Sequence, residues 1–223
     1  MDGLLADSYF AQDLRPSPSQ NEGAAIASTI ASLNLQKHPE GGYYAETDRA
    51  SLLIPNPFKV SDGSTGSGAD KDSVRNASTT IFYLLTPKSP VGHFHRNKAR
   101  TVHTLHFGRG RYVLIHEDGQ VETFIVGHDL ARGEKLQWIV DGGKYKASYL
   151  LPDKGAEESK GGLLISETVV PGFEFSDHDF LTVEGLLKFH LFEGRRAVTK
   201  EECRKQLGWL LNEGERKKLE LVK

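Results

Sequence analysis

The sequence predicts an all-β fold, a sandwich or barrel with a helix at each end, and three observations carry this prediction. Short runs of β-branched and aromatic residues recur at regular spacing along the middle of the chain. Many of the 23 glycines separate these runs, where turns are expected. With 223 residues, 38% of them hydrophobic, the chain can form one large core. We therefore expect one β domain over residues 20–195, preceded by a flexible arm over residues 1–19.

Composition and charge exclude several classes of function. Lysine plus arginine (28) nearly balances aspartate plus glutamate (30), so the net charge is −2 and no basic excess can contact nucleic-acid phosphates. No apolar run approaches the roughly 18 residues of a membrane span. The N-terminus lacks the pattern of a signal peptide. The single cysteine, Cys203, excludes an internal disulfide framework. We expect a cytoplasmic protein that binds neither nucleic acid nor membranes.

The first predicted element is a helix over residues 20–33. Ser19 and Glu22 have the spacing of a capping box, and apolar residues then recur at helical spacing. Further along, residues 59–75 are rich in Gly, Ser and Asp and contain almost no apolar side chains. Because strand patterns lie on both sides of this segment, we predict a mobile insertion rather than a linker between domains.

Seven short strands follow, with the rhythm of a sandwich or barrel. They are predicted over residues 79–85, 101–107, 111–116, 120–126, 136–140, 144–151 and 163–169. The chain closes with a helical segment over residues 196–223. There, Thr199 and Glu202 form a second capping box, and Cys203, Leu207, Leu210 and Leu211 mark an apolar helical stripe.

Five short motifs, in the same order along the chain, resemble those of the cupin-5 family of the cupin superfamily. The first is the sequence LQKHPEGGYY, which begins at Leu35 and is followed by Glu46-Thr47. The other four lie at residues 77–85, His95-Arg96, 121–123 and 170–177. The resemblance covers about residues 26–190. In the first motif the two glycines indicate a structural role, because they permit positive φ or a close strand contact. Glu40 and Tyr43 beside them can still reach a pocket.

This resemblance implies a cupin-type double-stranded β-helix, or jelly-roll barrel, with flanking N- and C-terminal helices. It also implies a homodimer and a ligand cavity inside the barrel. The mouth of a barrel is a common place for a small-molecule site on general grounds as well. Because a shared fold does not determine function, the cavity residues must indicate the chemistry.

Metal-binding cupins use a His-x-His pair and a glutamate from one motif and a histidine from a second, and the resemblance places these four positions. His93 and His95 supply the pair, and alternation along a strand is expected to put both on the inner face. The glutamate position falls on Thr101, and the second histidine position falls on Lys146. Threonine is not a charged ligand, and a protonated lysine repels a cation. We therefore expect no bound cofactor.

A different set of ligands would still allow a divalent metal to bind. If Thr101 points inward, His103 does too, so His93, His95 and His103 would offer three imidazoles to a metal. His106 would then face outward. This alternative is a metal-dependent cupin enzyme such as a dioxygenase or decarboxylase.

Without a metal, the same side chains form a partly cationic pocket for a small polar or anionic ligand. The candidate ligand-binding residues are His103, Thr101, Lys146 and Tyr112. By similarity to the metal-free cupin epimerases, His95 is the candidate base, supported by His93, and a tyrosine would return the proton. The candidate tyrosines are Tyr83, Tyr112 and Tyr145.

The leading hypothesis is therefore isomerase- or epimerase-like proton transfer without a metal. The metal-dependent enzyme is one alternative, and a non-catalytic small-molecule-binding or storage-like protein is another. The expected partners are a small-molecule ligand and a second copy of the chain.

Overall fold

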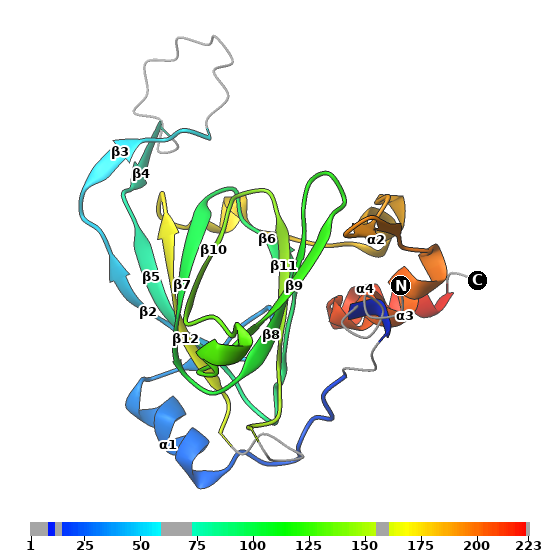
Figure 1. Cartoon of the computed structure of the whole chain (residues 1–223). Helices are drawn as coiled ribbons and strands as arrows, with labels where there is room; N and C mark the ends of the chain where they lie inside the picture. Colours follow the sequence, from blue (N-terminus) through cyan, green and yellow to red (C-terminus); the bar gives the residue numbers. More distant parts are fainter. Residues whose placement is uncertain (1–8, 12–14, 59–72, 155–160, 222–223) are drawn as a thin grey trace.

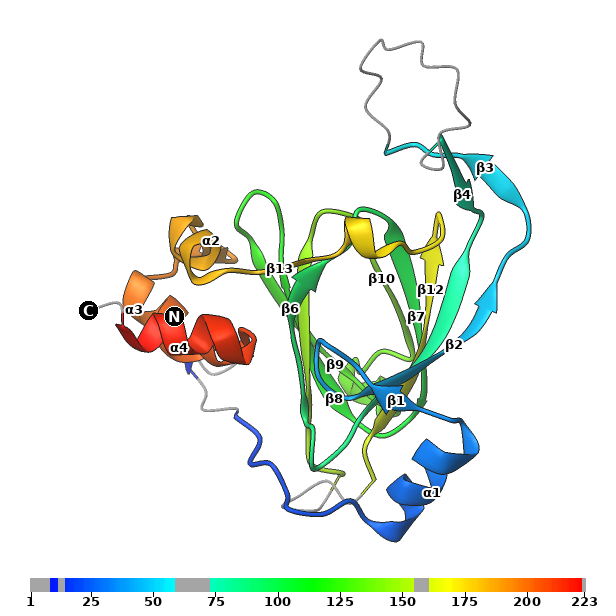
Figure 2. The ribbon, with the colours of Figure 1, turned by 180° about the vertical axis from the view of Figure 1, so that it is seen from behind.

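Two antiparallel sheets face each other and enclose the interior of a β-barrel (Figure 1; Figure 2). The computed structural model describes residues 9–11, 15–58, 73–154 and 161–221. The larger sheet has six strands in the order β1-β2-β5-β12-β7-β10, and the smaller has five in the order β13-β6-β11-β8-β9. Many neighbouring strands come from distant parts of the chain, as in a jelly roll, and this confirms the predicted all-β barrel.

The elements of the barrel have the following bounds. The larger sheet contains β1 (Gln36–Lys37), β2 (Tyr43–Arg49), β5 (Thr79–Leu85), β12 (Leu163–Val170), β7 (Arg100–Phe107) and β10 (Gln137–Val140). The smaller contains β13 (Asp179–Phe180), β6 (Val91–Arg96), β11 (Tyr145–Leu150), β8 (Gly110–Ile115) and β9 (Val121–Val126). All seven predicted strands form, with ends that differ from the predicted ends by at most one residue.

Shorter elements surround the barrel. Two ribbons pair β3 (Leu53–Pro55) with β4 (Val74–Asn76) and β14 (Phe192–Glu193) with β15 (Arg196–Ala197). The α-helices are α1 (Ala24–Ser32), α2 (Val183–Lys188), α3 (Lys200–Leu207) and α4 (Glu213–Leu221). The 3-10 helices are η1 (Tyr9–Ala11), η3 (Leu130–Arg132), η4 (Phe175–Asp177) and η5 (Gly208–Leu210). Among the helices of the described residues, none is long and apolar enough to span a membrane.

The strand β11 shows how side chains alternate between the two sides of the smaller sheet. Tyr145, Ala147 and Tyr149 pack on the outer side, in an apolar cluster with the C-terminal helices (Figure 1). Lys146 and Ser148 instead line the interior of the barrel. The residues of the predicted C-terminal stripe, Cys203, Leu207, Leu210 and Leu211, are all buried in this outer cluster. The C-terminal helices therefore cover one outer side of the barrel.

The two predicted capping boxes have different outcomes. At α3 the box forms: the Thr199 hydroxyl accepts from the Glu202 N–H (3.2 Å), and the Glu202 carboxylate accepts from the Thr199 N–H (2.9 Å). At α1 the prediction of a box is wrong, because the helix begins after Gly23 and no side chain caps it. Glu22 instead accepts hydrogen bonds from the hydroxyls of Tyr43 and Thr86, so it joins the start of the helix to the larger sheet.

We expect Thr199→Ala to lower the free energy of unfolding by about 1 kcal/mol, because it removes a cap that satisfies a backbone N–H. Urea denaturation measures this change. Ser19→Ala is the matched control, since the Ser19 hydroxyl bonds only within an exposed turn, and it should change the value by less than about 0.5 kcal/mol. Equal losses in the two variants would contradict the assignment of the caps.

The first residues of the chain are partly fixed in place. Tyr9 and Phe10 are buried in the outer apolar cluster, and the Tyr9 hydroxyl donates to the Gln206 carbonyl (3.1 Å). The expectation of a flexible arm over residues 1–19 is therefore wrong for these two residues. Of the predicted insertion, residues 59–72 lie outside the described part of the chain. The domain limits and the homodimer remain predictions, and sedimentation at micromolar concentration tests the latter.

Candidate metal centre

A tight loop between β1 and β2 carries Glu40 into the barrel. The Glu40 N–H donates to Nδ1 of His38 (3.1 Å), and the Glu40 carbonyl accepts from the N–H of His93 (2.7 Å). Gly41 has a φ of +102°, and a Cβ at this position would overlap the carbonyl oxygen of Val91. Only glycine meets both demands, so the HPEGG sequence lets the loop lie against β6 with Glu40 buried.

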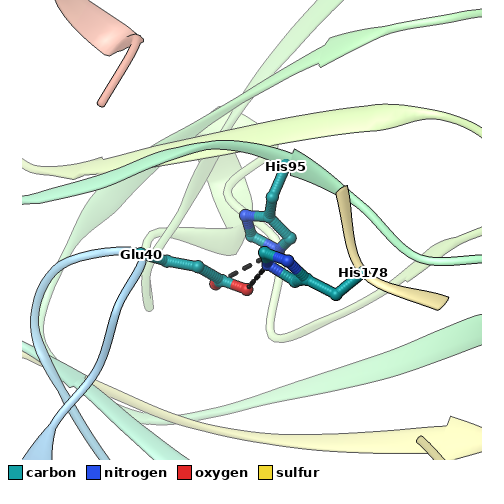
Figure 3. Close-up of side chains that lie close together, drawn as sticks. All are labelled: Glu40, His95 and His178. Carbon is teal, nitrogen blue, oxygen red and sulfur yellow. Dashed lines mark hydrogen bonds and ion pairs between the residues drawn. The ribbon is translucent and has the colours of Figure 1, made fainter. Parts of the chain in front are cut away.

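Glu40 meets two histidines there (Figure 3). Its Oε2 lies 3.2 Å from Nε2 of His95 on β6, and its Oε1 lies 2.8 Å from Nε2 of His178, just before β13. The two imidazole rings are stacked, with centroids 5.3 Å apart. One ligand atom from each of the three residues lies within 4.8 Å of the others, so the group could hold a metal ion.

A hydrogen bond at the second ring nitrogen determines the tautomer of His95. Its Nδ1 lies 2.9 Å from the carbonyl oxygen of His93. Because a carbonyl only accepts, Nδ1 carries the proton, and Nε2 of a neutral His95 presents a lone pair to Glu40. The carboxylate of Glu40 also presents lone pairs across this 3.2 Å contact. The contact is therefore favourable only if a cation, either a proton or a metal ion, lies between the two atoms.

Burial and neighbouring charges shift the pKa values of both groups. Burial lowers the pKa of His95 to about 4, although the carboxylate of Glu40 acts in the opposite direction. Burial alone would raise the pKa of Glu40, but His95, the hydrogen bond from His178 and the nearby His38 lower it to about 2. At neutral pH the pair is a neutral imidazole that faces an ionised carboxylate.

A buried ion pair holds the segment that carries His178. Arg75 on β4 and Asp177 form a bidentate pair, in which Nη2 lies 2.9 Å from Oδ1 and Nη1 contacts Oδ2. The two side chains are 7% and 1% exposed. His178 follows Asp177 directly and packs edge-on against Phe173 and Phe180. This packing fixes the imidazole beside Glu40.

A second polar cluster lies inside the barrel. The Nζ of Lys146 on β11 lies 2.6 Å from Oε2 of Glu167 on β12 and 2.9 Å from Nε2 of His103 on β7. All three side chains are buried, and the His103 ring stacks on Trp138 with centroids 5.1 Å apart. Burial opposes ionisation of Glu167, but Lys146 and His103 outweigh it and hold the pKa of this carboxyl well below its usual range.

The two clusters border one small cavity. Its lining consists of Glu40, Tyr83, His95, Tyr112, Lys146, Ala147, Ser148 and Glu167. About 10 Å³ is open to the centres of water molecules, which is room for about one water. A larger hollow of about 410 Å³ lies on the surface beside Arg109 and Asp129. There Arg109 pairs with Glu134, and Asp129 pairs with Lys154.

Most predicted site residues lie on the inner face. His95, Tyr112 and Lys146 line the cavity. Thr101 and His103 are buried on β7, while His106 on the same strand is exposed, as predicted. Thr101 does not line the cavity. Of the three candidate tyrosines, Tyr83 and Tyr112 line the cavity. The hydroxyl of Tyr145 instead donates to the carboxylate of Asp179 (3.3 Å).

A β-bulge turns His93 away from this site. Lys146 on β11 pairs with His95, and Ser148 pairs with Gly92, so His93 and Phe94 both lie opposite Ala147. Phe94 packs in the outer cluster, and His93 lies near Leu210 and Arg216 of the C-terminal segment. The expectation that His93 and His95 share the inner face is therefore wrong. The ligand set of His93, His95 and His103 does not form.

The position of His93 predicts an acid-sensitive outer layer. Burial, with a contribution from Arg216, lowers the pKa of His93 to about 4. Since an unfolded histidine has a pKa of about 6.5, the unfolded chain takes up a proton that the folded chain does not when the pH falls from 6.5 towards 4. The free energy of unfolding should therefore fall over this range. We expect a smaller loss between pH 7 and pH 5 in His93→Gln than in the wild type, measured by denaturant titration; equal losses would contradict this.

Sequence reasoning did not identify Glu167 or His178. Glu167 is the one charged residue on β12, in phase with the buried Ile165 and Val169, and that phase was a usable signal. His178 lies in a segment without strand or helix periodicity, where no pattern indicates the direction of a side chain. Glu40 was noted only as a residue within reach of a pocket.

Comparisons with known proteins agree with this architecture. Residues 27–181 match the family Cupin_5, described as Cupin superfamily (DUF985). The uncharacterized protein YML079W of Saccharomyces cerevisiae is 47% identical over 181 residues, which cover 81% of this chain and 87% of that protein. A hypothetical protein from Leishmania major superposes with a TM-score of 0.60 at 30% identity and covers 75% of this chain and 92% of its own. Protein SO0799 from Shewanella oneidensis superposes with a TM-score of 0.59 at 27% identity, and the match covers 75% of this chain and 90% of that protein. The resemblance drawn from the five motifs is confirmed, and the chain belongs to the Cupin_5 (DUF985) family of the cupin superfamily.

Proposed function

We propose that this protein is a metal-dependent cupin that acts on a small molecule inside the barrel, with Glu40, His95 and His178 as the metal ligands. The observation that carries the proposal is the 3.2 Å contact between Nε2 of His95 and Oε2 of Glu40, two atoms that both present lone pairs. Two imidazoles and a carboxylate suit divalent iron, manganese, nickel or zinc and leave coordination positions open for a small molecule.

The surroundings of the three ligands support this function. A bound metal would supply Lewis-acid chemistry. Metal-ligating histidines ordinarily donate the second ring N–H to a backbone carbonyl or carboxylate, and His95 does so to His93. His178 is held through the Arg75–Asp177 pair. The hydroxyls of Tyr112 and Ser148 face the same cavity and can bind a polar molecule there.

The second candidate function is metal-independent proton transfer, the leading hypothesis from the sequence. The same contact favours it if a proton lies between Glu40 and His95, because His95 would then be a base paired with a carboxylate. Tyr112 would be the acid, since burial raises its pKa well above the usual range and keeps it protonated, whereas the Tyr83 hydroxyl donates to the Gly41 carbonyl.

Elemental analysis and metal titration of the untagged protein distinguish the two functions. If the proposal is correct, the purified protein holds close to one divalent metal per chain, and the metal-free protein binds Mn²⁺ in a calorimetric titration. We expect His95→Gln and Glu40→Gln to weaken Mn²⁺ binding at least about 100-fold, since loss of groups that merely support ligands already costs 10–100-fold.

His93→Gln is the matched control. It changes the neighbouring member of the His-x-His pair, which lies outside the barrel, and should leave Mn²⁺ affinity unchanged. If His93→Gln abolishes binding and His178→Gln does not, the ligand set is wrong. If the wild type binds no metal but exchanges a substrate hydrogen with deuterated solvent, the second function is the correct one.

A further inference from the structure

His103 and Glu167 lie side by side on the inner face of the larger sheet. They are directly opposed in the register of β7 and β12, and Nε2 of His103 lies 3.3 Å from Oε2 of Glu167. The ammonium of Lys146 reaches these two atoms from β11 in the opposite sheet, at 2.9 Å and 2.6 Å. An imidazole and a carboxylate therefore converge on one cation, which the chain itself supplies.

The two acceptor atoms have the chemistry and the spacing of a zinc site. Imidazole nitrogen and carboxylate oxygen are ordinary zinc ligands, with bonds of about 2.0–2.2 Å. Two such ligands of a tetrahedral ion lie about 3.4 Å apart, which is close to the 3.3 Å between His103 and Glu167. A zinc ion in place of the ammonium can therefore bind both atoms without a change in their separation.

Both side chains are held in place by the fold. The ring of His103 is fully buried, stacks on Trp138 with centroids 5.1 Å apart and meets Tyr112 edge-on at 5.5 Å. Glu167 is buried as well, and a carboxylate buried without a cation is costly. The pair is thus arranged in advance and requires a positive charge between its two sides.

We propose that His103 and Glu167 form a second cation site in the barrel, that Lys146 fills it, and that Lys146 thereby limits the number of metal ions the barrel holds. A tethered ammonium competes well with a free ion, because its local concentration at the site is high. It also repels any divalent cation that approaches the same two atoms. The inference stands apart from the proposed function, since the metal centre proposed above shares none of these three residues.

Zinc titration of Lys146→Ala tests the inference. The substitution removes the ammonium and the carbon chain that carries it, which leaves the two acceptor atoms and space for an ion with water ligands. We expect Lys146→Ala to bind one more Zn²⁺ per chain than the wild type in a calorimetric titration. The wild type itself should bind one Zn²⁺ if the proposed function is correct and none if it is not, so the difference between the two proteins reports on the second site alone.

Thermal stability provides a second measurement. Lys146→Ala leaves the carboxylate of Glu167 buried without its cation, so the metal-free variant should melt at a lower temperature than the wild type. Zn²⁺ at about 100 times its dissociation constant should raise the melting temperature of the variant by at least about 5 °C more than it raises that of the wild type. A variant that folds only when Zn²⁺ is present supports the inference equally.

Further variants identify the ligands of the additional ion. Lys146→Ala combined with Glu167→Gln removes both charges, and this protein should fold but bind no additional Zn²⁺. His103→Gln introduced into Lys146→Ala should weaken the additional site at least about tenfold. His103→Gln alone should leave the zinc count of the wild type unchanged, because the ammonium still fills the site. Glu40→Gln introduced into Lys146→Ala should leave the additional ion bound.

The results that would overturn the second cation site differ from those that would overturn the proposed function. Equal zinc counts in the wild type and in Lys146→Ala overturn the second site, as does an additional ion that survives His103→Gln unweakened. A Lys146→Ala protein that stays unfolded in excess Zn²⁺, while its combination with Glu167→Gln folds, also overturns it. If Glu40→Gln removes the additional ion, that ion belongs to the proposed metal centre and the second site fails. A wild type without zinc and a Lys146→Ala protein with one zinc ion would instead overturn the proposed function and leave the second site standing.

Discussion

Glu167→Ala should lower the free energy of unfolding by about 3–5 kcal/mol, because it leaves the ammonium of Lys146 buried without its carboxylate. Lys146 is 3% exposed. Its remaining partner, Nε2 of His103, is a neutral acceptor that cannot balance the charge. Urea denaturation at neutral pH measures the loss.

The double variant Lys146→Met with Glu167→Leu is the control. It removes both charges and replaces them with apolar side chains of similar volume, a change that is often neutral or stabilising for a buried pair. We expect it to recover most of the stability lost in Glu167→Ala. A double variant as unstable as the single one would mean that packing around Glu167, rather than the buried charge of Lys146, determines the loss.

Gly41→Ala should cost about 2–6 kcal/mol and should also abolish metal binding. A φ of +102° is strained for alanine, by roughly 1–3 kcal/mol. The added Cβ would overlap the carbonyl of Val91, and relief of such overlap costs roughly 1–3 kcal/mol more. The backbone can relieve both only if the loop moves away from β6, which withdraws Glu40 from His95 and His178. Denaturation and Mn²⁺ titration measure the two effects.

Gly133→Ala separates the two causes. Gly133 also has a positive φ, of +79°, but a Cβ there would meet no atom within 4 Å. We expect it to cost about 1 kcal/mol, from the backbone alone, and to leave Mn²⁺ affinity unchanged. Equal costs in the two glycine variants would show that the loop at Gly41 has room for a side chain.

The strands could be predicted because each carries its own signal. The sequence from Lys144 to Leu151, for example, predicts a strand, and the alternation of side chains along it agrees with the inward position that the family resemblance implies for Lys146. The same rule failed at His93, where one extra residue in β6 shifts the phase between Gly92 and His95. Nothing in the sequence His-Phe-His reveals such a bulge, because it depends on the pairing with β11.

The site could be predicted only in part, for a related reason. His95 and Lys146 were expected from the motif positions that the family resemblance implies, and Tyr112 was one of three candidate tyrosines; all three line the cavity. His178 follows from no local pattern, because the Arg75–Asp177 ion pair, formed across a long separation in the sequence, holds its segment over Glu40. The proposed ligand set therefore lies where the family motifs did not indicate it, and Lys146, at the position expected to hold a metal-binding histidine, belongs to a buried ion pair.

The packing of Tyr9 and Phe10 beside the C-terminal helices has a consequence for biosynthesis. The layer over the outer side of the smaller sheet is built from opposite ends of the sequence. During translation the strands that bear Phe94, Val113 and Tyr149 leave the ribosome well before Leu207, Leu210 and Leu211, which complete their cover. Until then a nascent barrel presents an apolar sheet face, the kind of surface that chaperones bind and that aggregates when unprotected. A truncation at either end of the gene would leave this same face uncovered.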